Sequence, residues 1–332
     1  MSTVIRGLGA LMVALLIGLW ATPTTARASA TEAAPTVCRV GVYFMSIHNV
    51  DTAAGTFDAN FWMWSVCPTR DMEPLKTMQF LNAESVEGSL DSNLQRGEGW
   101  WSTRLFTGTF RENFDLANYP FDHQSLDLQI EESVLDERGL RYSLDVAQSG
   151  LDAKLTTPGW LISDLKLQSG VTTRDTTFGD PSLPNGQSGY ASMTVKLKAN
   201  RTKGANFIKA TFPLYIAAFL ALISMGFDVV ATDHFLGRMG ALGTILFAVV
   251  LSFVSVDQLV GPHQGLFFLD QIHFAVLALI LLATGWSVLA HRAAGRFMDG
   301  AVVQRWDLRV TLGLLALYLI ANLLMILNAA SG

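Results

Sequence analysis

Two patterns of hydrophobic and polar residues follow one another along the chain. From about residue 36 to residue 204, apolar and polar positions alternate, as in LDLQIE at 126–131. Alternation with a period of two predicts strands that bury one face, and turn-rich stretches such as GDPSLPNGQSG separate them. No helical pattern of comparable length interrupts this part. We therefore expect residues 31–204 to form an antiparallel β-sandwich.

Charged residues almost disappear after Lys209 in four windows, each close to the ~20 residues that span a bilayer as a helix. These windows predict a transmembrane domain over 205–332, with helices at about 205–227, 238–258, 270–291 and 308–330. Half of all residues are hydrophobic, which is typical of a membrane protein. The predicted fold class is a β + α membrane protein, in which the sandwich precedes a four-helix transmembrane bundle.

Residues 1–30 have the features of a secretory signal peptide. Arg6 precedes an apolar core at 8–20, and the small residues of ARASA suit cleavage after Ala28 or Ala30. The alternative is an uncleaved anchor helix.

The two cysteines, Cys38 and Cys67, are candidates for a disulfide, because an exported domain folds in an oxidising compartment. Their midpoint falls in DTAAGT at 51–56, which is a good turn sequence. If 40–47 and 57–66 pair as a hairpin about this turn, the cysteines lie opposite each other at its open end. Two unpaired buried thiols are the alternative.

Basic residues are distributed unevenly among the connections between the four windows. They stand in the first and third connections, at Arg238, Arg292, Arg296, Arg305 and Arg309, and the second connection has none. The positive-inside rule therefore places the sandwich outside the cytoplasm. Residues 31–204 include 22 acidic and 15 basic residues, so their net charge of −7 favours cations over nucleic acid as partners.

Five segments occur in a characteristic order: GWWSTRLFTGTF, NYPFD at 118–122, SMTVKLKANR, FPLYI and LGRMGALGTIL. Together with a β-domain before four helices, they resemble the pentameric ligand-gated ion channels, or Cys-loop receptor superfamily. In animal members two cysteines close the NYPFD loop. The matching positions here are Glu112 and Leu126, so the chain is similar to the bacterial branch that lacks this bridge.

The resemblance implies a homo-oligomer of five subunits in the bacterial inner membrane, in contact with membrane lipids, with a periplasmic sandwich. A small-molecule or proton agonist would bind between adjacent sandwiches, and permeating ions would pass along the second helix. We expect no cofactor and no enzymatic activity, because no metal-ligand spacing, phosphate loop or nucleophile constellation is present.

One face of the predicted second helix has the composition of a pore lining. With Arg238 as the helix start, six residues lie within about 80° of one another: Gly240, Thr244, Phe247, Leu251, Ser255 and Gln258. Bulky apolar rings can exclude water and ions, and polar rings on either side can hydrate them. The alternative is a buried packing helix whose hydroxyls bond its own backbone.

Charge selectivity is where the sequence departs from the family. Cation channels of this type usually carry a glutamate before the basic residue at the inner mouth, whereas Gly237 precedes Arg238 here. Asp257 at the outer mouth favours cations, and Arg238 would favour anions if it faced the lumen. In the family this basic position mostly points away from the lumen. We expect cation conduction.

The resemblance also implies which residues couple the sandwich to the pore: Pro120, Phe121, Asp122, Arg201 and Pro262, with the turn at 51–56. Asp122 and Arg201 would form an ion pair, and two solvated surface charges are the alternative. His123 and His263 would lie nearby, either as proton-sensitive groups or as ordinary exposed residues.

For the agonist, the resemblance implies aromatic residues at the subunit boundary. Trp62 and Trp64 alternate with the inward residues of their strand, and Phe178 and Tyr190 flank a long hairpin that would cap the site. A non-conducting, membrane-tethered sensory or binding protein is the competing functional interpretation.

Overall fold

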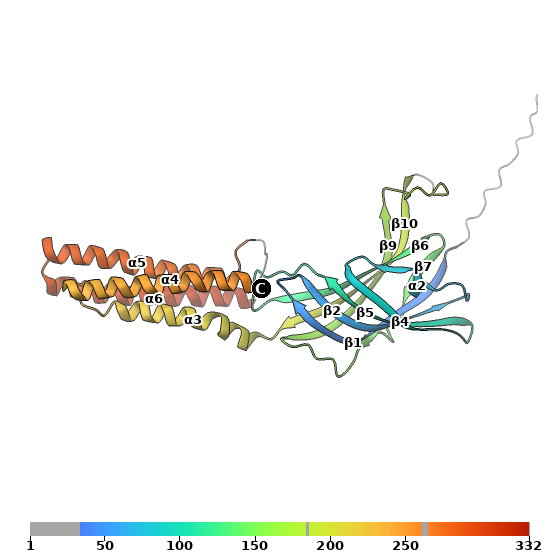
Figure 1. The fold of residues 1–332 in the computed structure, drawn as a ribbon, viewed down its shortest axis with the longest axis horizontal. Coiled ribbons are helices and arrows are strands. Elements are labelled where there is room, and N and C mark those ends of the chain that lie inside the picture. The colour runs from blue at the N-terminus through green and yellow to red at the C-terminus, as the bar shows by residue number, and fades with distance from the viewer. Residues whose placement is uncertain (1–33, 184–185, 261–264, 332) are drawn as a thin grey trace, which may run out of the picture. The chain divides into compact units, whose positions relative to one another are not determined.

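Strands come first along the chain and four long helices follow, in a computed structural model that describes residues 34–183, 186–260 and 265–331 (Figure 1). The expected signal peptide, Pro262 and His263 lie outside the described residues. So do the side chains of Asp257 and Gln258, of which only the helical backbone is described. The predicted order of β-structure before four apolar helices is confirmed.

The strands form two sheets. The first has the order β4-β5-β2-β1-β7, with β8 also paired to β1, and the second has the order β3-β6-β10-β9. The strands of the first sheet are β1 (Thr36–Asp51), β2 (Thr56–Cys67), β4 (Ala83–Arg96), β5 (Gly99–Arg111), β7 (Leu140–Leu144) and β8 (Gly150–Leu151). Those of the second are β3 (Met78–Phe80), β6 (His123–Asp136), β9 (Trp160–Arg174) and β10 (Ser188–Arg201), and a short helix α2 (Pro74–Thr77) precedes β3.

Alternating side chains of both sheets meet in one shared core. Every second residue of β2 is buried, and Phe61 at its centre contacts a ring of phenylalanines from both sheets: Phe44, Phe80, Phe106 and Phe110. The second sheet adds Leu126, Leu128 and Ile130 from β6 to the same cluster. The alternation in the sequence therefore reports correctly which faces are buried.

The sheets are not wholly antiparallel, which corrects the predicted fold class. β7 and β8 both pair with β1 in parallel. The chain leaves β6 in the second sheet and crosses to the edge of the first, where the backbone N–H of Thr36 donates to the Gly139 carbonyl at 3.1 Å. A strand that arrives by such a crossover has its direction set by the crossover and not by a tight hairpin.

The predicted hairpin is formed by β1 and β2. Val40 pairs with Ser65, and Asp51 pairs with Thr56 across the turn. The Asp51 carboxylate accepts hydrogen bonds from two backbone N–H groups of the turn, each at 2.9 Å. Cys38 and Cys67 form a disulfide at the open end, and both are buried.

The helices are α3 (Lys203–Ser224), α4 (Thr232–Val260), α5 (Phe268–Arg296) and α6 (Gly300–Ser331). α4 begins six residues before Arg238 and α6 begins eight residues before the expected 308, because charged residues interrupt an apolar window without ending a helix. At the start of α6, Asp299 accepts a hydrogen bond from the Ala301 backbone N–H at 3.2 Å, as expected of an N-cap.

All four helices are long and apolar enough to cross a membrane, and they indicate a multi-pass membrane protein. Their shared core is formed largely by α5, which contacts α3, α4 and α6 through residues such as Leu269, Ile272 and Val276. The outer faces of α3 and α6 expose many large aliphatic side chains, which suits contact with lipid.

The hairpin geometry predicts the effect of removing the disulfide. Replacing both cysteines by serine should lower the free energy of unfolding by about 2–4 kcal/mol, because the bridge restricts the unfolded chain. Thermal unfolding of the full-length protein, followed by circular dichroism, would measure this. Mass spectrometry of the unreduced mature protein that found two free thiols would contradict the pairing.

Candidate functional site

The NYPFD loop forms a tight turn between β5 and β6. The backbone N–H of Tyr119 donates to the Leu116 carbonyl at 3.0 Å, and that of Phe121 donates to Asn118 at 2.7 Å. The Tyr119–Pro120 peptide bond is cis. Tyr119 and Pro120 are buried and Phe121 is half-buried, so the loop is packed against its surroundings.

Asp122 and Arg201 form a buried ion pair at the end of this loop. The Arg201 Nε donates to Oδ1 at 2.7 Å, and its Nη2 donates to Oδ2 at 3.1 Å. The side chains are only 2% and 10% exposed. A two-bond pair of this kind holds its geometry more firmly than a surface contact does.

Two aromatic rings and an amide complete the surroundings of this pair. The guanidinium carbon of Arg201 lies 4.1 Å from the ring centroid of Trp160 and 4.7 Å from that of Tyr119. The Gln124 side chain donates to Asp122 Oδ2 at 2.7 Å and accepts from the Asp115 backbone N–H at 3.0 Å. Stacking and hydrogen bonding therefore compensate both charges for the loss of water.

The same loop contacts the helices. The Phe121 ring lies 5.3 Å from that of Phe207 on α3 and 5.7 Å from that of Phe268 on α5. The Phe268 backbone N–H donates to the Ala117 carbonyl at 3.0 Å. Arg201 is the last residue of β10, two residues before α3 begins. The loop, β10, α3 and α5 thus meet at one place, which we call the junction.

Glu112 stands at the start of the loop that carries NYPFD, which we call the junction loop, and joins it by hydrogen bonds to β6. Its carboxylate accepts from the backbone N–H of Asp127 at 2.9 Å and from that of Asn113 at 3.0 Å. Burial raises the pKa of this carboxyl above its ordinary value of 4.5, and the two backbone hydrogen bonds partly oppose the rise. Leu126, the other position that the resemblance aligns with a cysteine of animal receptors, is fully buried.

The predicted pore face of α4 is exposed in the single chain. Gly240, Thr244 and Ser255 are exposed, and Phe247 and Leu251 are 65% and 52% exposed. The opposite side of α4 packs on α3 and α5 through residues that include Leu242 and Val249. The Thr244 and Ser255 hydroxyls donate to carbonyls one turn earlier, at 3.0 and 2.9 Å.

Arg238 points away from this face, which is the orientation that the resemblance implies for this basic position. It is fully buried and is ion-paired with Asp307 of α6 at 2.8 Å. Because α4 begins at Thr232, position 238 lies within the helix and points its side chain into the bundle. A guanidinium buried there needs a carboxylate, and Asp307 supplies one.

The proposed ligand residues are partly brought together. The rings of Phe178 and Tyr190 lie 6.4 Å apart beside the β9–β10 hairpin, and Phe178 is 66% exposed. Trp62 is half-buried on β2, in the other sheet. Trp64 is engaged within the chain, since its indole N–H donates to Asp145 at 3.1 Å. His123 is exposed and lies 2.7 Å from the Asn200 side chain.

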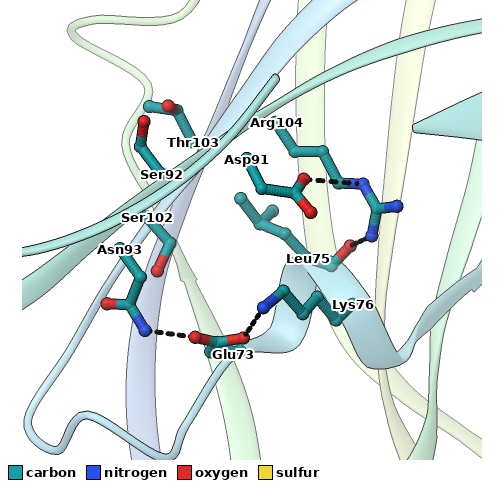
Figure 2. A pocket seen from close by; sticks show the side chains of 9 residues that line it. All are labelled: Glu73, Leu75, Lys76, Asp91, Ser92, Asn93, Ser102, Thr103 and Arg104. Carbon is teal, nitrogen blue, oxygen red and sulfur yellow. Dashed lines mark hydrogen bonds and ion pairs between the residues drawn. The ribbon is translucent and has the colours of Figure 1, made fainter. Parts of the chain in front are cut away.

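Two of the cavities lie near the features described above, one apart from the predicted residues and one lined in part by Ser255 of the predicted pore face. Figure 2 shows a polar one of about 130 Å³ between α2, β4 and β5, where Glu73 pairs with Lys76 and Asp91 with Arg104. The acidic and basic side chains that line this cavity therefore neutralise one another. The other, of about 270 Å³, lies between α3, α4 and α5 next to Tyr119.

Sequence reasoning missed Trp160, Gln124 and Asp307. Gln124 follows Asp122 by two residues where the extended chain enters β6 at His123, so its position on the same side of the chain was a usable signal. Trp160 contacts Arg201, and Asp307 pairs with Arg238. Both partners are distant in the sequence, so no local pattern predicts these contacts.

The chain matches no model of a known protein family, and no curated protein matches it either. The junction and the exposed face of α4 are therefore the features that bear on function.

Removing either partner of the Asp122–Arg201 pair should lower the free energy of unfolding by about 3–5 kcal/mol, because the remaining charge stays buried. Asp122→Asn, Arg201→Gln and the double variant should show coupling of about 0.5–3 kcal/mol. The more exposed pair of Asp127 and Lys196, whose side chains are 15% and 45% exposed and have 3.5 Å between charged atoms, is the matched control. Its coupling should stay below about 1 kcal/mol. Additive effects at the first pair would contradict its role in holding the junction.

Glu112 predicts a pH dependence of stability. The pKa of Glu112 is higher in the folded chain than in the unfolded chain. Its contribution to the free energy of unfolding is therefore complete at a pH below the unfolded-state pKa and is lost as pH rises through the folded-state pKa. The melting temperature of wild type relative to Glu112→Gln should therefore fall as pH increases from about 4.5 towards neutrality. A difference that stays constant or grows over this range would refute the assignment.

Proposed function

We propose that this chain is a subunit of an agonist-gated ion channel, similar to the bacterial branch of the pentameric ligand-gated family. Five copies would surround a pore lined by α4. The observation that carries this proposal is the exposed face of α4, on which glycine and hydroxyl residues accompany two bulky apolar ones.

This face differs from an ordinary lipid-facing surface. The exposed sides of α3 and α6 are dominated by large side chains such as Phe219, Leu319 and Leu323. On α4, Gly240, Thr244 and Ser255 interrupt the apolar surface. Small and hydroxyl residues suit a water-filled pathway that narrows at Phe247 and Leu251.

The junction supplies a route from ligand binding to the pore. Arg201 connects β10, which follows the hairpin beside Phe178 and Tyr190, to the start of α3. Phe121 and Ala117 contact α5, which in turn packs on α4. A displacement of the hairpin would therefore be transmitted through packed groups to the helix that lines the pore.

Ligand and location belong to the same proposal. A small-molecule or proton agonist would bind between Phe178 and Tyr190 of one copy and Trp62 of the next. Arginines lie at the end of α5 and near the start of α6. They favour a cytoplasmic position for the end of the bundle where these two helices connect, with the β-domain in the periplasm. The net charge of residues 31–204 favours cations as the permeating ions.

A second function is favoured by one observation. The hydroxyls of Thr244 and Ser255 bond their own helix, which is also what a lipid-facing helix requires. In that case the chain would be a membrane-tethered sensory or binding protein that does not conduct. Current through reconstituted protein separates the two functions.

Replacing Phe247 by serine tests the proposal without a known agonist. If five phenyl rings close the pore by excluding water, serine should wet it and raise the open probability in the absence of ligand. Planar-bilayer or oocyte recording, with surface expression measured in parallel, would detect this. The matched control is Phe219→Ser on α3, since Phe219 is 64% exposed against 65% for Phe247.

The control should express and remain closed. Normal expression of Phe247→Ser without leak current, and with unchanged agonist sensitivity, would remove α4 from the pore. Loss of expression would indicate a packing role, for which truncation of a buried aromatic costs on the order of 3–5 kcal/mol.

A further inference from the structure

Arg238 and Asp307 form a buried network that joins α4 to α6. The Arg238 Nη1 donates to Asp307 Oδ2 at 2.8 Å, and Nη2 donates to Oδ1 at 3.0 Å. Nη1 also donates to the Met225 carbonyl at the end of α3, at 3.1 Å. From α5, the Trp286 indole N–H donates to Asp307 Oδ1 at 2.7 Å. One carboxylate therefore receives donors from two other helices.

Both charged groups of this network are buried, so each needs the other as a partner. The Arg238 side chain is 0% exposed and that of Asp307 is 11% exposed. A guanidinium cannot lose its proton, so without a carboxylate it must either remain charged in the bundle or turn towards water. Asp307 is the acidic side chain that pairs with it in the described part of the chain.

The pair lies on the side of α4 opposite its exposed face. Arg238 and Phe247 are nine residues apart, which at 100° per residue places them on opposite sides of the helix. Asp233 precedes Phe247 by fourteen residues and lies within about 40° of it. Asp233 is exposed, so this end of the exposed face carries an acidic side chain while the basic one is turned away.

We propose that Asp307, on α6, is a specificity-determining residue that keeps the Arg238 charge off the ion pathway and so leaves the pathway selective for cations. The inference rests on the proposed channel function. Asp307 does not contact the ions; it acts by positioning Arg238. Trp286 supports it by orienting the carboxylate.

Asp307→Asn is the direct test, because asparagine has nearly the same volume and still accepts a hydrogen bond from Trp286. The unpaired guanidinium should leave its buried site for water at this end of the bundle, where its charge would act through space on ions at the mouth of the pathway. In a Phe247→Ser background, which needs no agonist, the sodium-to-chloride permeability ratio should fall by about tenfold or more, since five like charges act together on each ion. Reversal potentials in a sodium chloride gradient measure this ratio.

Three further variants show whether the freed arginine is the cause. Arg238→Gln combined with Asp307→Asn removes both charges and should restore the parent ratio. Trp286→Phe removes one donor to the carboxylate and should shift the ratio in the same direction by less, which keeps the test available if Asp307→Asn does not assemble. Asp299→Asn makes the same change at the exposed N-cap of α6, where asparagine caps a helix about as well as aspartate, and should have no effect.

Cysteine labelling provides a readout that does not need current. The two native cysteines are joined, so an introduced cysteine is the one free thiol. A water-soluble methanethiosulfonate should label Gly240→Cys, where a side chain meets no neighbour, and spare the buried Leu242→Cys. Position 242 lies one helical turn after Arg238 on the same side of α4, so Asp307→Asn, which frees Arg238 from its buried site, should increase labelling of Leu242→Cys.

The outcomes separate the two claims. Absence of current in every variant, or no labelling at 240, would count against the proposed channel. Current with an unchanged permeability ratio in Asp307→Asn, or an equal shift in the double variant, would overturn the inference about Asp307. An unaltered labelling pattern in Asp307→Asn would overturn it even if no current were found.

Discussion

The ion pair between Asp122 and Arg201 is the interaction on which the organisation of the junction depends. Arg201 ends the last strand and lies two residues from the first long helix, so its position determines how the chain passes from one part to the other. The pair tolerates burial because Tyr119, Trp160 and Gln124 compensate each charge. Phe121 and Ala117 can then contact the helices from a loop whose end is held in place.

The same physical requirement recurs at Arg238 and Asp307. A charge removed from water must meet an opposite charge and further hydrogen-bond partners, or it destabilises the fold. At both places the partners come from different elements of the chain. Each pair therefore restricts the relative positions of those elements, in addition to any contribution it makes to stability.

Much of this arrangement was predictable because its signals are local. Alternation of buried and exposed residues defined β2 and its pairing with β1 about the turn at 51–56, and apolar windows defined four helices. The parallel pairing of β7 was not predictable, since it depends on a crossover between sheets. The pairing of Arg238 with Asp307 was not predictable, because the two residues stand 69 positions apart, and the start of α4 at Thr232 has no apolar signal.

Glu112 gives the junction loop a closure of a different kind from a covalent bridge. A hydrogen bond that a backbone N–H donates to a carboxylate contributes only about 1.5–3 kcal/mol, so thermal motion breaks and remakes it repeatedly. Its strength depends on proton concentration and not on the presence of oxidants or reductants. The loop of this chain is thus closed by reversible hydrogen bonds. It folds without an oxidation step, and chemical reduction leaves it intact.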